Sequence, residues 1–378
     1  MKVLVAGDFA PVHYRFQKLV AEGDCADILS RIPEITSRQD LSIVNFEATV
    51  ADPEKDTPIA KCGPNIHTSA NAVGMLKQAG FDLLTLANNH ILDFGKTAQD
   101  RVIKLARENG LDTVGAGDNL ADAAKIYYKK VGDKTLAVVN CCEHEFTIAT
   151  DDSAGANPID PVAQYYQIKE ARSKADYVLV ITHGGHEHFQ LPNPKMQQTY
   201  RYFVDCGADA VVNHHQHCYS GYEVYRGKPI FYGLGNFCFD SRLRITDPLW
   251  TEGFMAELTF GDSIEFNLIP YTQCTAQDCA VRIMADRTDF DRRIADLNAI
   301  IADPKRLKEE VEKYYATCSK SILEPFEPYT GRYFRAAFSR GWLPSLFSRK
   351  KALAITNYVN CQAHLEKLRY ALTHKTRQ

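Results

Sequence analysis

The sequence contains no apolar run approaching the roughly 20 residues that a membrane-spanning helix requires. It also lacks any Cys-x-x-Cys pair among its eleven cysteines, an odd number that fits reduced thiols better than a disulfide framework. No internal repeat or low-complexity tract occurs, and 45% apolar with 24% charged residues is ordinary for globular proteins. The chain is therefore expected to be globular rather than membrane-spanning or disulfide-stabilised.

An apolar segment of signal-peptide length is missing at the N-terminus. Lys2 is followed only by Val3–Ala6 before Gly7 and Asp8, and cleavage there would remove Asp8, a candidate site residue. The expected localisation is the cytoplasm, with peripheral contact with the inner membrane face as an additional hypothesis.

The length of 378 residues exceeds the size at which a single hydrophobic core usually stops growing, so at least two structural units are expected. After Tyr271 the pattern changes to helices alone. This change predicts one large domain over residues 1–272 and a helical extension over residues 273–378.

Polar side chains follow five apolar segments, at the points where strands are expected to end. Asp8 follows residues 2–6, Glu47 follows 41–44, Asn88-Asn89-His90 follows 81–87, His183 follows 177–182, and His214–His217 follow 210–213. In open α/β folds this edge carries the active site. Carboxylate with imidazole suits divalent Mn, Fe, Zn, Co or Ni, and a bridging carboxylate holds two ions about 3.5–4 Å apart. The pattern predicts a dinuclear hydrolase site.

Strands and helices alternate through the first two hundred or so residues, with helices expected at 69–78, 96–109 and 161–174. Such alternation predicts a largely parallel sheet. Short strands are then expected at 223–225, 229–233, 254–260 and 264–271, followed by helices at 289–301, 304–318 and 351–373.

Six short motifs follow one another along residues 1–270. They are Gly7-Asp8, Asn45-x-Glu47, Ala87-Asn88-Asn89-His90-x-x-Asp93-x-Gly95, His183-Gly184-Gly185-x-Glu187, Asn213-His214-His215-Gln216-His217 and Leu234-Gly235-Asn236-Phe237. In these motifs and their order the chain resembles the capsule-synthesis protein CapA family, a branch of the calcineurin-like metallophosphoesterase superfamily. It departs from the superfamily in lacking a histidine at Ala10, in carrying Glu47 where aspartate is usual, and in the turn before His215.

The resemblance implies an α/β fold, a metallophosphatase-like α/β/β/α sandwich with an α-helical C-terminal extension. It also implies one or two divalent transition-metal ions, Mn, Fe, Zn, Co or Ni, held by Asp8, Glu47, Asn89, His183, His215 and His217. Glu47 is assigned as the bridging carboxylate. The catalytic assignments are His90, which assists the leaving group, and Asp93, which orients it. Asn45, Asn88, Glu187 and Asn236 are assigned to substrate contact or to support of the site.

Several of these residues have plainer explanations. Asp8 and the Asn88-Asn89 pair are also typical of turns, and Asp93 is equally well explained as the cap of a helix beginning near Lys96. Along an extended strand His215 and His217 face one side and His214 the other, so His214 is expected to be structural. His186 and His188 are expected to be exposed loop residues.

The predicted function is metal-dependent hydrolysis through a metal-bound hydroxide, most naturally of a phosphoester, in capsule, exopolysaccharide or poly-γ-glutamate metabolism. One alternative is a γ-glutamyl amide hydrolase or transferase, and another is a non-catalytic metal-binding scaffold of a capsule-synthesis assembly. The expected partner is an anionic small-molecule or polymer substrate, and no nucleic acid. The oligomeric state is left open.

The C-terminal segment 331–378 is strongly basic. It holds ten Lys or Arg and a single acid, Glu366, a formal charge of +9 against −12 for the rest of the chain. Aromatic residues such as Trp342 and Phe347 lie among the basic ones. The segment is explained either by contact with an anionic membrane or acidic partner or by a helix packed on the acidic main domain.

Overall fold

The computed structural model describes the chain except residues 13, 22–26, 62, 242, 324–326, 330, 361–367, 369–371 and 373–378. It divides into two compact units, Met1–Val311 and Glu312–Gln378. Within the described residues no helix is both long and apolar enough to cross a bilayer.

The first unit contains an eight-stranded mixed sheet of order β18-β17-β16-β1-β2-β5-β6, with β15 also paired to β1. Its strands are β1 (Lys2–Ala10), β2 (Leu41–Phe46), β5 (Leu83–Thr85), β6 (Asp112–Val114), β15 (Asn236–Phe239), β16 (Glu252–Phe260), β17 (Ile264–Thr272) and β18 (Arg282–Ile283). Strands β1, β2, β5 and β6 are parallel, whereas β16 is antiparallel to β1. The parallel strands bring their carboxyl ends to one edge.

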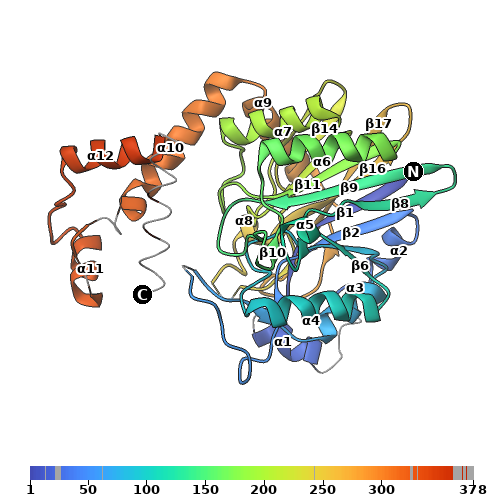
Figure 1. Cartoon of the computed structure of the whole chain (residues 1–378), viewed down its shortest axis with the longest axis horizontal. Coiled ribbons are helices and arrows are strands. Elements are labelled where there is room, and N and C mark those ends of the chain that lie inside the picture. The colour runs from blue at the N-terminus through green and yellow to red at the C-terminus, as the bar shows by residue number, and fades with distance from the viewer. Residues whose placement is uncertain are drawn as a thin grey trace. The chain divides into compact units, whose positions relative to one another are not determined.

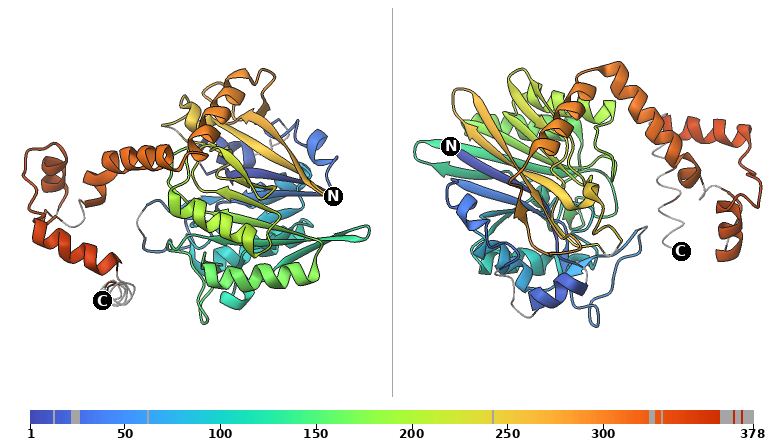
Figure 2. Two further views of the ribbon diagram at one scale, coloured as in Figure 1. Left: turned by 90° about the horizontal axis from the view of Figure 1, so that it is seen from above. Right: turned by 180° about the vertical axis from the view of Figure 1, so that it is seen from behind.

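A six-stranded sheet of order β13-β14-β12-β11-β9-β8 lies in the same unit. Its strands are β8 (Tyr127–Val131), β9 (Lys134–Cys142), β11 (Tyr177–His183), β12 (Ala210–His214), β13 (Tyr222–Tyr225) and β14 (Lys228–Phe231). β9, β11, β12 and β14 are parallel. The hairpin of β8 and β9 extends past the neighbouring strands in Figure 2 and marks the amino end of β9. The carboxyl ends of the parallel strands, which carry the candidate site residues, therefore lie at the opposite end of this sheet.

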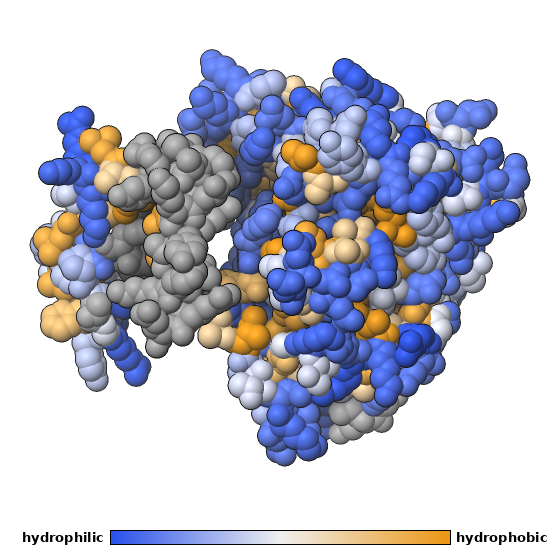
Figure 3. Space-filling view, in the orientation of Figure 1, coloured by the Kyte–Doolittle hydropathy of each residue, from blue (hydrophilic) through white to orange (hydrophobic). Residues whose placement is uncertain are grey.

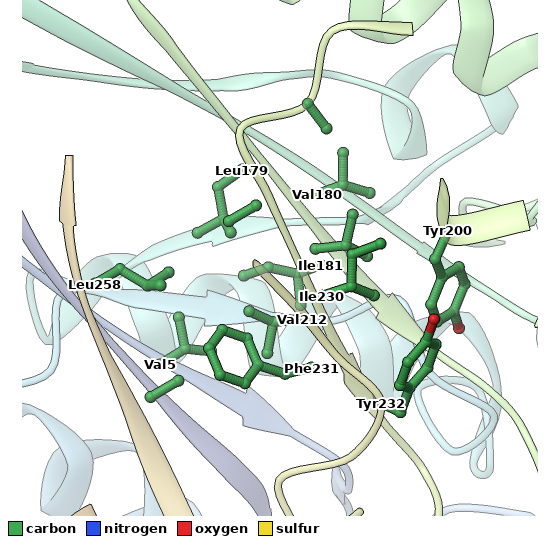
Figure 4. Packing of buried hydrophobic residues seen from close by; sticks show 14 of the residues in the cluster. Val5, Leu179, Val180, Ile181, Tyr200, Val212, Ile230, Phe231, Tyr232 and Leu258 are labelled. Carbon is green, nitrogen blue, oxygen red and sulfur yellow. The ribbon is translucent and has the colours of Figure 1, made fainter. Parts of the chain in front are cut away.

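The two sheets pack face to face because apolar residues fill both faces of β1. Val3 and Val5 belong to the cluster that also contains Val212 and Phe231 of the second sheet, and Figure 4 shows Val5, Val212 and Phe231 in this packing. Leu4 and Ala6 belong to the other cluster. Each such Val or Leu contributes about 1.5–3 kcal/mol when fully buried, so the core fixes the strands that carry the site.

Helices cover the outer face of each sheet, α6 (Pro161–Lys174) and α7 (Pro194–Cys206) on one side and α3 (Asn71–Gln78) and α4 (Gly95–Glu108) on the other (Figure 1). Asp160 caps α6 by accepting the backbone N–H groups of Val162 and Ala163, and Asn193 caps α7 by accepting that of Met196. Each of these helices has a proline at its first position. The α/β/β/α sandwich expected from the sequence is confirmed.

The remaining elements are shorter or lie towards the C-terminus. They are α1 (Tyr14–Ala21), α2 (Pro33–Thr36), β3 (Thr49–Val50), β4 (His67–Thr68), β7 (Ala116–Gly117), α5 (Leu120–Ala123), β10 (Gly155–Ala156), α8 (Pro248–Thr251), α9 (Thr288–Ile301), α10 (Pro304–Leu323), α11 (Arg332–Ser339) and α12 (Arg349–Asn360). The helix expected over 351–373 corresponds to α12 as far as Asn360, and most of its later residues lie outside the described part of the chain.

The division between the units falls after Val311, not at the expected boundary between residues 272 and 273. The difference arises because α9 is amphipathic and packs on the first unit. Phe290 lies with its ring 5.2 Å from that of Tyr219, and Leu297 and Ile301 are buried in the cluster between the sheets. The helical extension therefore begins within α10.

Candidate metal centre

Six side chains proposed as metal ligands from the sequence meet at the carboxyl ends of β1, β2, β5, β11 and β12. They are Asp8, Glu47, Asn89, His183, His215 and His217, and each is less than 10% exposed. Their positions follow from the topology, since parallel strands end together. The fold brings together residues that lie up to 209 positions apart in the sequence.

The donor atoms form two groups that share Glu47. Ligand atoms of Asp8, Glu47 and His217 lie within 4.8 Å of one another, as do those of Glu47, His183 and His215. In the second group His183 Nε2 is 3.5 Å from Glu47 Oε1 and 3.1 Å from His215 Nδ1. Asn89 Oδ1 lies 3.0 Å from the same nitrogen. Two metal positions with Glu47 between them fit this arrangement.

The chemistry of Glu47 is a direct test of whether a cation fits here. Both carboxylate oxygens are buried and neither has a hydrogen-bond partner. Burial, reinforced by the negative charge of Asp8, raises the pKa of Glu47 well above its usual value. A buried carboxylate without partners is costly. One or two cations would satisfy these oxygens, so the donor set fits a metal.

The imidazoles are also in the form that a metal requires. Burial lowers the pKa of His183 well below its usual value and that of His217 to about 4, so both are neutral near pH 7. Asn236 Oδ1 lies 3.0 Å from His217 Nδ1, which places the proton on Nδ1. Nε2, 3.7 Å from Glu47 Oε1, then keeps its lone pair for a ligand.

Three asparagines hold the ligand positions. Asn45 Nδ2 donates to Asp8 Oδ1 at 2.7 Å, and Asn88 Nδ2 donates to the Phe46 carbonyl at 2.9 Å, beside Glu47. Asn236 Nδ2 donates to the His217 carbonyl at 3.1 Å, in addition to its contact with the ring. These contacts are consistent with the supporting roles expected for Asn45, Asn88 and Asn236.

His90 lies beside the two groups and belongs to neither. Its Nδ1 is 2.6 Å from Asp93 Oδ2, and its Nε2 is 4.0 Å from Glu47 Oε1. Asp93 does not cap the following helix, since α4 has no side-chain cap and its first residue is Gly95. Of the two roles considered for Asp93, the structure therefore favours orientation of the His90 ring.

The expected orientation of His214 is wrong. β12 ends at His214. His215 and His217 have φ angles of 89° and 54°, so the chain turns here, whereas the sequence predicts an extended strand. His214 Nδ1 consequently lies 3.3 Å from Asp8 Oδ1. Burial raises the pKa of Asp8, but the adjacent imidazoles, His214 above all, lower it by a larger amount. The pKa of Asp8 is therefore below its usual value.

The loop after β11 also differs from its expectation. His186 and His188 are partly buried, not exposed, because His188 packs its ring 5.7 Å from that of Trp250 and 6.0 Å from that of His217. Glu187 is exposed and lines the cavity in front of the donor groups. That cavity has a volume of about 850 Å³, and its wall includes Lys61, His90, Glu145, Glu187, His188 and Trp250.

Two site residues are missed by the sequence reasoning. Lys61 contacts Asp93, and Glu145 Oε2 accepts a hydrogen bond of 3.0 Å from Asn89 Nδ2, which turns the amide oxygen of Asn89 towards His183. Glu145 could have been found, because it follows the apolar strand β9 just as Glu47 follows β2. Lys61 lies in an irregular segment and carries no such signal.

Residues 2–241 match the family model described as bacterial capsule synthesis protein PGA_cap. The capsule biosynthesis protein CapA of Bacillus anthracis is 38% identical over 204 residues, covering 52% of this chain and 49% of that protein. The PGA biosynthesis protein CapA of Bacillus subtilis is 37% identical over 231 residues, 60% of each chain. The chain thus spans about half to 60% of the length of these relatives. A solved phosphatase from Mycoplasma pneumoniae is 13% identical with a TM-score of 0.45, covering 73% of this chain and 95% of that one.

Proposed function

Because the chain belongs to the bacterial capsule synthesis protein family PGA_cap, we propose that it is a metal-dependent phosphoester hydrolase in capsule or poly-γ-glutamate metabolism. The pathway is suggested by the names of its relatives in Bacillus. The observation that carries the chemistry is Glu47, a buried carboxylate with two unpartnered oxygens, shared by two groups of imidazole and carboxylate donors.

The residues that would hold the ions are Asp8, Glu47 and His217 at one position, and Glu47, Asn89, His183 and His215 at the other. Cations bound there supply Lewis-acid activation of a water molecule and of the phosphoryl group. The protein holds these ligands rigidly, because Asn45 and Asn236 fix Asp8 and His217 by hydrogen bonds. This rigidity lowers the reorganisation required during reaction.

His90 acts on the leaving group in this mechanism. Its Nδ1 proton is held by Asp93, which leaves Nε2 facing the cavity. As the bond from the water oxygen to phosphorus forms and the bond to the leaving oxygen breaks, a proton on Nε2 passes to that leaving oxygen. The attacking water gives up one proton to solvent, and Nε2 takes a proton from solvent before the next turnover. The cavity of about 850 Å³ has room for a leaving group of considerable size.

The test is hydrolysis of p-nitrophenyl phosphate and bis(p-nitrophenyl) phosphate by chelator-treated protein reloaded with Mn²⁺, Fe²⁺, Zn²⁺, Co²⁺ or Ni²⁺. We expect turnover that disappears on chelation and returns with metal. Release of p-nitroaniline from γ-glutamyl-p-nitroanilide without ester hydrolysis would replace the phosphoester proposal by an amidase. Stoichiometric metal without turnover of either class would indicate a metal-binding scaffold.

We further propose that the C-terminal unit contacts an anionic membrane surface. Tyr333, Phe334 and Trp342 are 86%, 62% and 73% exposed, next to arginines such as Arg340, whose guanidinium lies 5.5 Å from the Trp342 ring centre. Figure 3 shows hydrophobic and hydrophilic side chains mixed on this unit. Exposed aromatic residues among basic ones are typical of interfacial segments.

Neutralising Arg332, Arg335 and Arg340 to glutamine in the full chain is expected to weaken binding to phosphatidylserine vesicles on the order of 100-fold, since each basic residue near such a surface contributes about 1 kcal/mol. Sedimentation of vesicles at low and high salt measures this, and binding of the unmodified protein is expected to fall with salt. The matched control is Lys104→Gln/Arg107→Gln/Lys125→Gln on the first unit. Absence of vesicle binding by the unmodified protein at low salt would refute the proposal.

A further inference from the structure

A buried lysine reaches the catalytic candidates from outside the recognised motifs. Lys61 lies in the irregular segment between β3 and β4, yet its side chain is only 3% exposed. Its Nζ bonds to Asp93 Oδ1 and lies 3.4 Å from the Asn89 carbonyl oxygen. Lysine is rarely buried unless it is paired. The pairing of Lys61 with the Asp93 carboxylate therefore explains why its side chain is buried.

The same segment binds Asp93 at several points. The backbone N–H of Ile66 donates to Asp93 Oδ2 at 2.7 Å, and the Asn65 side chain and Ile59 N–H donate to the Asp93 carbonyl oxygen at 2.8 and 2.9 Å. Together with Lys61, four donors from residues 59–66 converge on this one aspartate. The segment is therefore built around Asp93.

The geometry of Lys61 relates it to His90 as well. Lys61 Nζ is 3.2 Å from His90 Nδ1. A protonated lysine has no acceptor, and Nδ1 is a donor when it is bonded to Asp93. The two nitrogens are thus close because both donate to the same carboxylate, Lys61 to Oδ1 and His90 to Oδ2.

We propose that Lys61 is a positioning residue, which holds the Asp93 carboxylate so that His90 presents Nε2 to the cavity. The buried Asp93 charge needs a counterion, and with Lys61 on Oδ1 the carboxylate cannot rotate about its Cβ–Cγ bond. Oδ2 is then left to accept from His90 and Ile66. Without Lys61 the carboxylate is held at Oδ2 alone, by Ile66 and His90, so it can tilt and the ring of His90 is held less firmly. The kinetic consequence rests on the proposed hydrolase function, whereas the structural one does not.

The kinetic test compares Lys61→Met with Lys55→Met, a lysine of the same segment that is 80% exposed. Lys61→Met is expected to lower kcat for p-nitrophenyl phosphate by about 10²-fold with little change in KM, because misplacement of a catalytic group by 1 Å can cost that much. Lys61→Arg is expected to recover part of the loss. Lys55→Met is expected to behave like the unmodified protein.

A double-variant cycle tests whether Lys61 acts through Asp93. Lys61→Met added to Asp93→Asn is expected to slow the enzyme no further than Asp93→Asn alone. A full multiplicative loss, or an effect confined to KM, would overturn the proposal and make Lys61 a direct substrate contact.

A second measurement needs neither metal nor activity. The proton in the 2.6 Å contact between His90 Nδ1 and Asp93 is expected to give a downfield resonance in the metal-free protein that disappears in His90→Asn. It should shift or broaden in Lys61→Met, or in Lys61→Gln if the methionine variant does not fold, and remain in Lys55→Met. An unchanged resonance would refute the positioning role even if the protein hydrolyses no ester. If the resonance behaves as expected but the unmodified protein hydrolyses no ester, only the proposed function is refuted.

Discussion

A protein carrying His215→Ala and His217→Ala is expected to lose its bound divalent metal, while the unmodified protein holds one or two equivalents after reconstitution. The two histidines belong to different donor groups that share Glu47, so the double change removes one imidazole from each. The loss of affinity should exceed the 10–100-fold that removal of an outer partner of a ligand typically costs. Metal analysis by mass spectrometry after gel filtration measures the outcome.

The control for this experiment is His186→Ala, a partly buried histidine near the same loop that contributes to neither donor group. It is expected to retain the full metal content. Unchanged binding in the double variant, or no metal in the unmodified protein under any loading condition, would contradict the metal centre.

The pH dependence of metal binding follows from Glu47. Its pKa is raised in the metal-free protein by burial, and a metal binds only the deprotonated carboxylate, so affinity is expected to fall as the pH drops through this raised pKa. The metal-free native state also binds this proton more tightly than the unfolded state does, so it loses stability as the pH rises through the same range. The increase in Tm on adding metal should therefore grow with rising pH, as scanning calorimetry would detect.

Replacing His90 with asparagine is expected to lower kcat by about 10²–10³-fold, with metal content unchanged and KM nearly constant. The reason is that His90 lines the cavity while its Nδ1 is engaged by Asp93 and its ring belongs to neither donor group. In the proposed mechanism the ring acts when charge develops on the leaving oxygen. Steady-state kinetics on a p-nitrophenyl ester, combined with metal analysis of the same preparation, measures both quantities.

His186→Asn is the matched control for His90→Asn and is expected to leave kcat and metal content unaltered. If His90→Asn loses metal together with activity, His90 is instead a ligand, and the distance of 4.0 Å from Nε2 to Glu47 Oε1 would have to shorten in the loaded protein.

Much of the fold could be predicted because its signals are local. The apolar runs that became β1, β2, β11 and β12 and the capped helix α6 depend on neighbouring residues, and polar residues after each strand indicated the edge of the sheet. The resemblance to the capsule-synthesis family was confirmed by the family match over residues 2–241. The observed boundary after Val311 could not be predicted in this way, because α9 belongs to the first unit through contacts with distant residues such as Tyr219.

The candidate site was less accessible to sequence reasoning where it depends on turns and on irregular chain. The position of His214 differs from the expectation because strand alternation ceases to apply once His215 adopts a left-handed conformation. Lys61 was missed because its role depends on a loop that returns to Asp93 from 32 positions away. Neither effect leaves a periodic signal in the sequence.

By itself, the sequence determined which chemical groups are available and on which strand ends they lie, because apolar alternation and turn residues act between near neighbours. Only the tertiary structure decided which donors share a point in space. Asp8 Oδ2 accepts a hydrogen bond of 3.2 Å from the backbone of His215, 207 positions away, and Glu47 stands between two donor groups with no partner of its own. Ligand and hydrogen-bond contacts operate over a few ångströms, so they are set by how the two sheets pack, and no pattern along the chain can specify them.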